Sequence, residues 1–167
     1  EHVNRVAVYK RNAGLKDEAT RFIQGPKTQM ADPHGIFVDE GRNEVYVANH
    51  GHWHETAAGE VFLQEGSVPP ELKGERKSYF DLVRNLEPSS GKFQLPSITV
   101  YARNAHGDVA PLRVIQGPKT LITDPSRLAT DPANNEIFVP LGNKVLVFPR
   151  EANGDVAPTR ILEGKDT

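Results

Sequence analysis

Three histidines alternate within one short stretch of the chain, at His50, His52 and His54. In an extended segment, side chains two residues apart project to the same side, so the three imidazoles could converge on one divalent metal ion. The spacing is not one of the strong zinc signatures, and the chain has no cysteine to serve as a further ligand. A solvated group of loop histidines is therefore the favoured interpretation, and a metal or catalytic site is the alternative.

Three further residues are candidates for the same surface. His34 and Asn49 are expected at the same end of their strands as His50, and Trp53 is the only tryptophan of the chain. Trp53 suits a packing anchor first and an exposed recognition aromatic second. The candidate residues for binding a ligand or partner are His34, Asn49, His50, His52, Trp53 and His54.

A repeated unit indicates which elements position these side chains. Val6–Tyr9 aligns without gaps with Ile98–Tyr101 and Val145–Phe148, and the last two copies of the unit start 47 residues apart. The segment Ile23–Thr28 recurs letter for letter at 115–120. Each apolar run is short, rich in Val, Ile, Tyr and Phe, and bounded by Gly, Pro, Asn or Asp, as short antiparallel strands are. A four-strand unit of this period is typical of a propeller blade.

The predicted fold is all-β: a β-propeller of four-stranded antiparallel blades, of which about two and a half are present. A half blade spans residues 5–28, a full blade spans 29–117 with an insertion at 52–96, and a second full blade spans 118–167. Propellers usually have about four to eight blades, so this number cannot close a ring. We therefore expect a segment of a larger propeller, and completion of the ring by other chains is the alternative.

The run "DPHGIFVD" at 32–39 and "NEVYVAN" at 43–49, followed by "SITVYARN" and "GDVAPLRVIQGP", resembles the NHL-type repeat of bacterial six-bladed propellers. The resemblance covers nearly the whole chain except the insertion, and it implies six blades in the complete ring. It implies little about chemistry, because similar propellers include binding scaffolds, lyases and lactonases. Where related lactonases place calcium ligands, only Asn49 suits calcium. A site like that of streptogramin lyases, with a divalent cation, fits better; its residues would be His34, His50, His52, His54 and Glu55.

The insertion at 52–96 has no counterpart elsewhere in the chain. It is polar and rich in turns, with an amphipathic stretch at 79–86 that could form two helical turns. In an up-and-down meander, it emerges on the same face as the links at 26–34 and 118–126. Long loops in compact domains are usually functional or disordered, and function on repeat scaffolds tends to lie on the face with the insertions. We therefore expect function to reside in residues 50–96.

Arginines recur at fixed positions of the repeat and could suggest anion binding. Because a residue present in every unit is usually architectural, we expect these arginines to pair with loop aspartates or to cover the outer strands. Asp32 and Asp124 precede prolines and are expected to form turns. The arginines are Arg11, Arg103 and Arg150 at one position, and Arg21, Arg113 and Arg160 at the other.

The composition narrows the function classes. A net charge of −2 gives no bulk attraction to nucleic acid or anionic membranes, and no apolar run is long enough to span a membrane. The absence of Cys excludes disulfides, thiolate chemistry and covalent haem attachment. Because the chain starts at Glu1 without an initiator Met, either a leader has been removed or the chain is part of a longer one, and we expect an extracytoplasmic location, periplasmic or secreted.

The predicted function is a non-enzymatic binding or assembly module that recognises a protein or other ligand through the insertion-bearing face. Its expected partners are a protein or the remaining propeller blades, and not nucleic acid. No cofactor is required by the sequence, although a divalent metal is possible at His50, His52 and His54. The alternatives are a metal-assisted lyase or hydrolase and a structural subunit of an extracellular assembly.

Overall fold

The computed structural model describes residues 4–55 and 91–164. These residues form strands and two short 3-10 turns, η1 (Pro26–Thr28) and η3 (Pro118–Thr120), and they contain no α-helix. No helix among them has the length and apolar character needed to cross a membrane. The strands are β1 (Arg5–Val8), β2 (Arg21–Gln24), β3 (Pro33–Asp39), β4 (Glu44–Asn49), β5 (His52–Glu55), β6 (Gly91–Gln94), β7 (Ser97–Ala102), β8 (Arg113–Gln116), β9 (Ala129–Asp131), β10 (Glu136–Leu141), β11 (Lys144–Pro149) and β12 (Arg160–Glu163).

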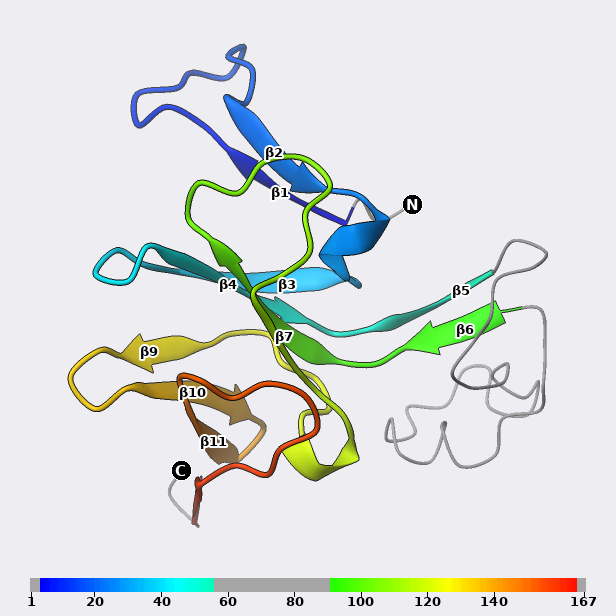
Figure 1. The fold of residues 1–167 in the computed structure, drawn as a ribbon, viewed down its shortest axis with the longest axis vertical. Coiled ribbons are helices and arrows are strands. Elements are labelled where there is room, and N and C mark those ends of the chain that lie inside the picture. The colour runs from blue at the N-terminus through cyan, green and yellow to red at the C-terminus, as the bar shows by residue number, and fades with distance from the viewer. Residues whose placement is uncertain (1–3, 56–90, 165–167) are drawn as a thin grey trace.

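Ten of these strands form three antiparallel sheets that lie side by side (Figure 1). The first sheet contains β1 and β2, the second contains β3, β4, β7 and β8, and the third contains β9 to β12. Within each sheet the strands follow one another in chain order, as a meander does. The all-β prediction and the predicted four-stranded antiparallel units are therefore confirmed.

Strand β4 lies at the centre of the packing because both of its faces are covered. Tyr46 and Ala48 belong to the apolar core between the second and third sheets. Val45 and Val47 point the other way, into the core between the first and second sheets. All six residues of β4 are buried. Burial on both faces explains why the strand is a nearly continuous apolar run rather than an alternating one.

Repeated turns join neighbouring sheets through their backbones. In the turn between β7 and β8, the Gly107 amide donates to the carbonyl of Phe22 at 2.7 Å, and its carbonyl accepts from Gln24 at 3.1 Å. The Asp108 carboxylate accepts from the Lys27 amide at 2.8 Å, at the start of η1. The same three contacts join the β11–β12 turn to β8 and η3; they are made by Gly154 with Val114 and Gln116, and by Asp155 with Lys119. The recurring "GDVAP" segments therefore hold adjacent sheets together.

Three of the repeated arginines join strands or sheets through ion pairs, but their partners differ from the expectation. Arg113 and Arg150 both bind the carboxylate of Glu44, at 2.9 and 2.7 Å. Arg160 pairs with Glu136, which occupies the position of Glu44 in the third sheet. For these three arginines the acids are glutamates that begin strands rather than loop aspartates, whereas Arg103 pairs with Glu40 of the β3–β4 turn. The loop aspartates Asp108 and Asp155 accept hydrogen bonds from backbone amides of the 3-10 turns.

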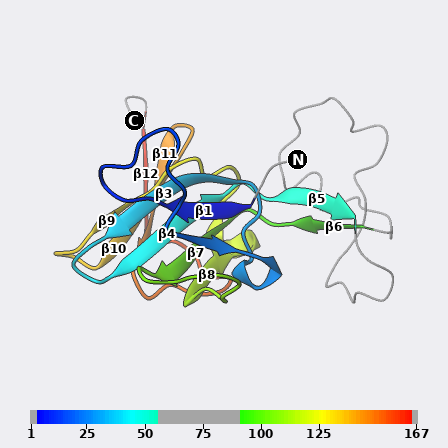
Figure 2. The same ribbon diagram turned by 90° about the horizontal axis from the view of Figure 1, so that it is seen from above.

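The insertion begins and ends with two strands that the sequence pattern did not predict. β5 pairs with β6 in antiparallel register, from His52 opposite Gln94 to Glu55 opposite Gly91. We call this pair the arm. It projects sideways from the second sheet in both views (Figures 1 and 2). The predicted amphipathic stretch at 79–86 lies outside the described residues.

Candidate functional site

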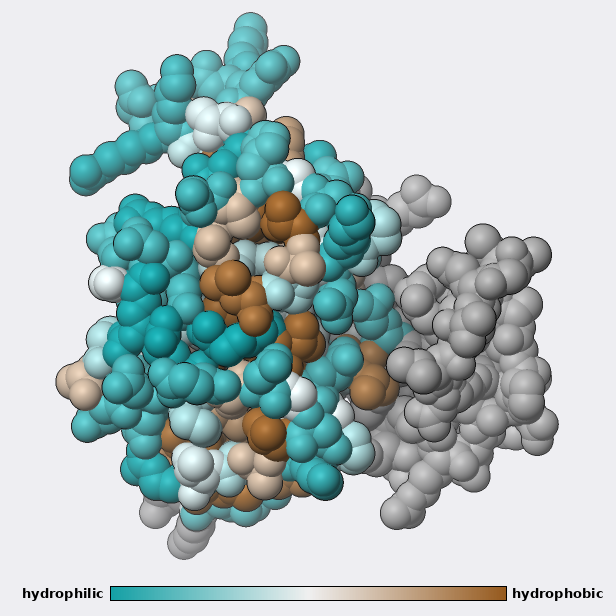
Figure 3. Space-filling view, in the orientation of Figure 1, coloured by the Kyte–Doolittle hydropathy of each residue, from teal (hydrophilic) through white to brown (hydrophobic). Residues whose placement is uncertain are grey.

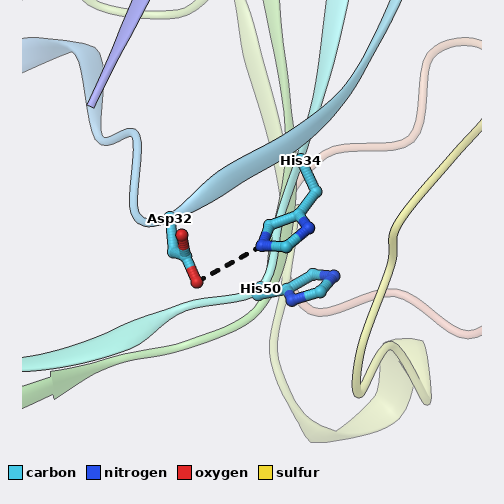
Figure 4. A group of neighbouring side chains, drawn as sticks. All are labelled: Asp32, His34 and His50. Carbon is cyan, nitrogen blue, oxygen red and sulfur yellow. Dashed lines mark ion pairs between the residues drawn. The ribbon is translucent and has the colours of Figure 1, made fainter. Parts of the chain in front are cut away.

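Two histidines and one aspartate meet where the second sheet approaches the third. Asp32 precedes β3, His34 lies near the start of β3, and His50 follows the end of β4. The β3–β4 register shifts between Pro33 and Gly35, so His34 is an extra, bulged residue. A bulge redirects the side chain of the inserted residue, and here it brings His34 over His50. We call Asp32, His34 and His50 the histidine cluster (Figure 4).

The two imidazoles of the cluster lie face to face. Their ring centroids are 3.4 Å apart and the planes differ by 11°. The Nε2 atom of His34 lies 3.4 Å from a carboxylate oxygen of Asp32. Asp32 has a left-handed backbone conformation, with φ of 52°. This conformation is uncommon outside glycine, although Asp and Asn adopt it more readily than other residues.

His50 also reaches across to the third sheet. Its Nδ1 atom lies 3.2 Å from the Asp124 carboxylate, and its Nε2 atom lies 3.0 Å from the Ser126 hydroxyl. Burial lowers the pKa of His50, and the neighbouring His34 adds to this effect, while the carboxylates of Asp124 and Asp32 oppose it. The imidazole is therefore neutral at neutral pH, with one nitrogen as donor and the other as acceptor.

The cluster has the donor set of a transition-metal site. One ligand atom each from Asp32, His34 and His50 lies within 4.8 Å of the others. Two imidazoles and one carboxylate suit zinc, iron, copper or nickel better than calcium or magnesium. The side chain of His34 is 40% exposed and that of Asp32 is 25% exposed, so an ion can reach the cluster from solvent. Binding through His50 would replace one of its hydrogen bonds, to Asp124 or to Ser126.

A hollow of about 460 Å³ adjoins the cluster on the side of the third sheet. Asp124, which contacts His50, forms part of its wall. The remaining wall is largely apolar, with Lys144 as the cationic group; the lining residues are Leu121, Thr123, Asp124, Leu141, Gly142, Lys144 and Leu146. A ligand with an apolar body and a polar head fits such a wall.

Of the predicted site residues, His34 and His50 meet, whereas Asn49 turns inward. Asn49 is completely buried, and its side-chain amide donates to Ser97 and Thr99. Its side-chain oxygen accepts from the Ala31 amide. These bonds tie β4 to β7 and to the segment before β3, so Asn49 stabilises the site rather than contacting a ligand.

The predicted trio of His50, His52 and His54 assumed one continuous extended segment. Gly51 interrupts it with φ of 78°, and β5 starts only at His52. His50 therefore lies outside the extended run of β5, and its imidazole stacks on His34. His52, Trp53 and His54 lie on β5 of the arm, and their side chains lie outside the described part of the structure.

Three residues of the site were not predicted as functional: Asp32, Asp124 and Ser126. Asp32 and Asp124 were assigned to turns because both precede a proline. The alignment of the two units contained a signal, however. It pairs Asp32 with Asp124 and His34 with Ser126, and adjacent sheets bring matching positions of a repeat close together.

Comparison of the chain with protein-family models, with curated proteins and with solved structures finds no match. The resemblance to the NHL-type repeat therefore stays a prediction.

Proposed function

We propose that the three sheets are blades of an NHL-like β-propeller, six-bladed when complete, that serves as a non-enzymatic binding module. In this proposal the insertion-bearing face is the recognition surface. A divalent transition metal held by Asp32, His34 and His50 anchors the ligand there. The blade assignment is supported by the repeated four-stranded meanders and by the repeated contacts between sheets.

The observation that carries the proposal is the stacked pair of His34 and His50 beside Asp32. The second and third sheets can be compared at the positions of this pair. In the third sheet, Ser126 and Gly142 occupy the positions of His34 and His50, and that sheet forms the same strands. The fold therefore does not require two histidines at this place, which favours a role in binding.

The donor set also indicates how a ligand would be held. Three protein ligands leave coordination positions open on a zinc or nickel ion. A carboxylate or imidazole of the bound partner would complete the coordination, while its apolar part would occupy the hollow beside Asp124. The arm borders the same face and would add contacts to a protein partner (Figure 1).

Isothermal titration of the whole chain with Zn²⁺ tests the proposal. The decisive variant is His34→Ser, which copies Ser126 and so introduces a residue that the repeat already tolerates. The control is His106→Ser, an exposed histidine on the β7–β8 turn. We expect one Zn²⁺ site whose affinity falls at least about tenfold in His34→Ser, since even residues outside the ligand set typically change affinity by this factor. Equal affinities in both variants would contradict the proposal.

A metal-assisted lyase or hydrolase is the second candidate. It is favoured by one observation, the open coordination positions that a set of two histidines and one carboxylate leaves, where a metal can activate water. Zn²⁺-dependent turnover of lactone or ester substrates that is lost in His34→Ser would favour this candidate over the binding module. Zn²⁺ binding without turnover would favour the binding module.

A further inference from the structure

Both ring nitrogens of His50 have partners in the segment that precedes β9. Nδ1 lies 3.2 Å from the Asp124 carboxylate, and Nε2 lies 3.0 Å from the Ser126 hydroxyl. A hydroxyl, an imidazole and a carboxylate linked in this order form the arrangement that activates a serine as a nucleophile. We call Ser126, His50 and Asp124 the serine triad. It shares His50 with the histidine cluster but draws its other two members from the third repeat unit.

The hydrogen bonds of the triad determine where its protons lie. A carboxylate can only accept, so Nδ1 of His50 carries the hydrogen that points to Asp124. In the neutral imidazole the other nitrogen is then an acceptor, and the Ser126 hydroxyl donates to it. This is the tautomer that a general base needs, because the lone pair of Nε2 faces the hydroxyl proton. His50 is therefore placed to remove the proton of Ser126.

Packed neighbours hold the triad in place. Pro125 is buried and precedes Ser126, and its ring restricts the backbone there. Gly35 approaches from β3 so closely that an added Cβ would lie 2.4 Å from the Ser126 carbonyl oxygen. His34 stacks on the ring of His50, with centroids 3.4 Å apart (Figure 4). The nucleophile and its base are thus supported by packing, as a preorganised site requires.

Ser126 and Asp124 have no other bonding role in the described part of the fold. Among residues 4–55 and 91–164, the Ser126 hydroxyl and the Asp124 carboxylate bond to His50 alone. Ser126 is exposed, so an electrophilic carbon can reach its Oγ. The repeat does not require a serine here, since the matching position in the second unit is His34. These observations favour a chemical role for the hydroxyl over a structural one.

The surroundings of Ser126 suit an acyl donor. The Arg127 amide follows the nucleophile and donates to no acceptor among residues 4–55 and 91–164, so it can donate to the oxyanion formed during attack on a carbonyl. The largely apolar hollow of about 460 Å³ has Asp124 in its wall. Apolar side chains show among hydrophilic ones on the surface over this sheet (Figure 3). The donor class is therefore an ester with a small apolar acyl group.

We propose that Ser126 of the metal-free chain is a reactive serine that accepts the acyl group of such an ester. As Oγ bonds to the carbonyl carbon, its proton passes to Nε2 of His50. The bond from this carbon to the leaving oxygen then breaks, and the leaving oxygen takes the proton from His50. The products are acylated Ser126 and an alcohol, without oxidation or reduction. Asp124 positions the imidazole and stabilises its transient charge.

The inference goes beyond the metal-dependent binding proposed above. A metal ion on His50 would occupy one of the two nitrogens that the triad uses, so the triad forms only in the metal-free chain. Acylation is therefore measured in EDTA, with the whole chain and p-nitrophenyl butyrate. Under this condition a failure of acylation leaves the metal site untouched, and a failure of Zn²⁺ binding leaves the acylation untouched.

Release of nitrophenolate and mass spectrometry of the digested chain measure the rate and the place of acylation. Ser126→Ala removes the nucleophile. His50→Gly removes the base and copies Gly142, the residue at this position in the third unit. The control is His106→Gly, which removes an exposed histidine of the β7–β8 turn. The other serines of the chain are a second control, because the same digest reports their labelling.

We expect butyrylation of Ser126 that is at least about a hundredfold slower in His50→Gly, the lower end of what a general base contributes. Ser126→Ala should abolish labelling of this peptide, and His106→Gly should leave the rate unchanged. Asp124→Asn should slow acylation and shift the nitrogen NMR signals of His50, because the carboxylate no longer selects the Nδ1–H tautomer. Absence of label on Ser126, labelling no faster than that of the other serines, or a rate unchanged in His50→Gly would overturn the proposal.

Discussion

Replacing Glu44 by Gln removes the charge that joins the second and third sheets. The carboxylate is 6% exposed, and it accepts hydrogen bonds from Arg113 at 2.9 Å, from Arg150 at 2.7 and 3.2 Å, and from the Tyr46 hydroxyl at 2.7 Å. Burial and the adjoining Glu44 raise the pKa of Tyr46 to about 12, so this hydroxyl keeps its proton and donates. Gln has nearly the same shape but no charge, so the substitution removes the carboxylate that Arg113 binds and leaves Arg150 with the exposed Glu151 at 3.4 Å.

The size of the effect follows from burial on both sides of the pair. Removing one partner of a buried ion pair destabilises a protein by about 3–5 kcal/mol, because the remaining charge stays desolvated. Arg113 and Arg150 keep 17% and 25% of their side-chain surface exposed, so solvent screens part of the loss. We therefore expect about 3 kcal/mol, the lower end of that range. For a chain of this length, the loss corresponds to a decrease in Tm of roughly 6–12 °C.

The repeat offers a matched control for this experiment. Glu136 occupies the position of Glu44 in the third sheet, but among residues 4–55 and 91–164 its one ion pair is with Arg160, whose side chain is 52% exposed. Glu136→Gln should therefore lower the free energy of unfolding by about 1 kcal/mol or less. Urea denaturation followed by tryptophan fluorescence and circular dichroism measures both variants. Equal losses for the two variants, or a loss below 1 kcal/mol for Glu44→Gln, would refute the reasoning from burial.

Three further predictions concern pH and local packing. Burial alone would raise the pKa of Glu44, but the hydrogen bonds and charges of Arg113 and its neighbours outweigh burial and lower this pKa below the ordinary 4.5. The carboxylate therefore contributes its full stabilisation above pH 4.5 and loses it as pH falls through the pKa of the folded state. Urea titrations should show that the difference in unfolding free energy between the unaltered chain and Glu44→Gln shrinks in acid. Gly35→Ala should destabilise the chain by about 1–3 kcal/mol, because the added Cβ would lie 2.4 Å from the Ser126 carbonyl oxygen; a thermal midpoint equal to that of the unaltered chain would contradict this. Asp108→Ala should lower the free energy of unfolding by about 1 kcal/mol, since it removes the acceptor for the amide of Lys27 at the start of η1. Hydrogen exchange of the Lys27 amide should accelerate in this variant.

The sequence was sufficient to predict the strands of the three sheets because two independent patterns, local composition and the internal repeat, indicate each strand. Local composition marks the apolar runs and their turns, and alignment with the other copies fixes where each run starts and ends. The arm was not predicted because this second source of information is missing for its two strands. β5 and β6 have no second copy, and the pairing of Trp53 with Phe93 depends on a contact across the insertion that no local pattern reveals.

The histidine cluster could be predicted only in part. His50 was recognised from the alternating histidines, and His34 because it was expected at the same end of its strand. Their stacking depends on the β-bulge at His34, which appears only once β3 and β4 are paired. Gly51 follows His50 with φ of 78°, and a Cβ added to it would lie 2.2 Å from the carbonyl oxygen of Gln94. Tertiary approach of the arm, rather than strand alternation, therefore sets the backbone after His50.

The metal site is tested most directly by X-ray absorption at the zinc edge of the whole chain loaded with one equivalent of Zn²⁺. Coordination by Asp32, His34 and His50 predicts two imidazole nitrogens at about 2.0–2.1 Å and oxygen ligands at about 2.0–2.2 Å. In the His34→Ser variant, one imidazole should disappear from the spectrum. A first shell of oxygen atoms alone, or an imidazole count that His34→Ser leaves unchanged, would contradict the assignment of this cluster as the metal-binding site.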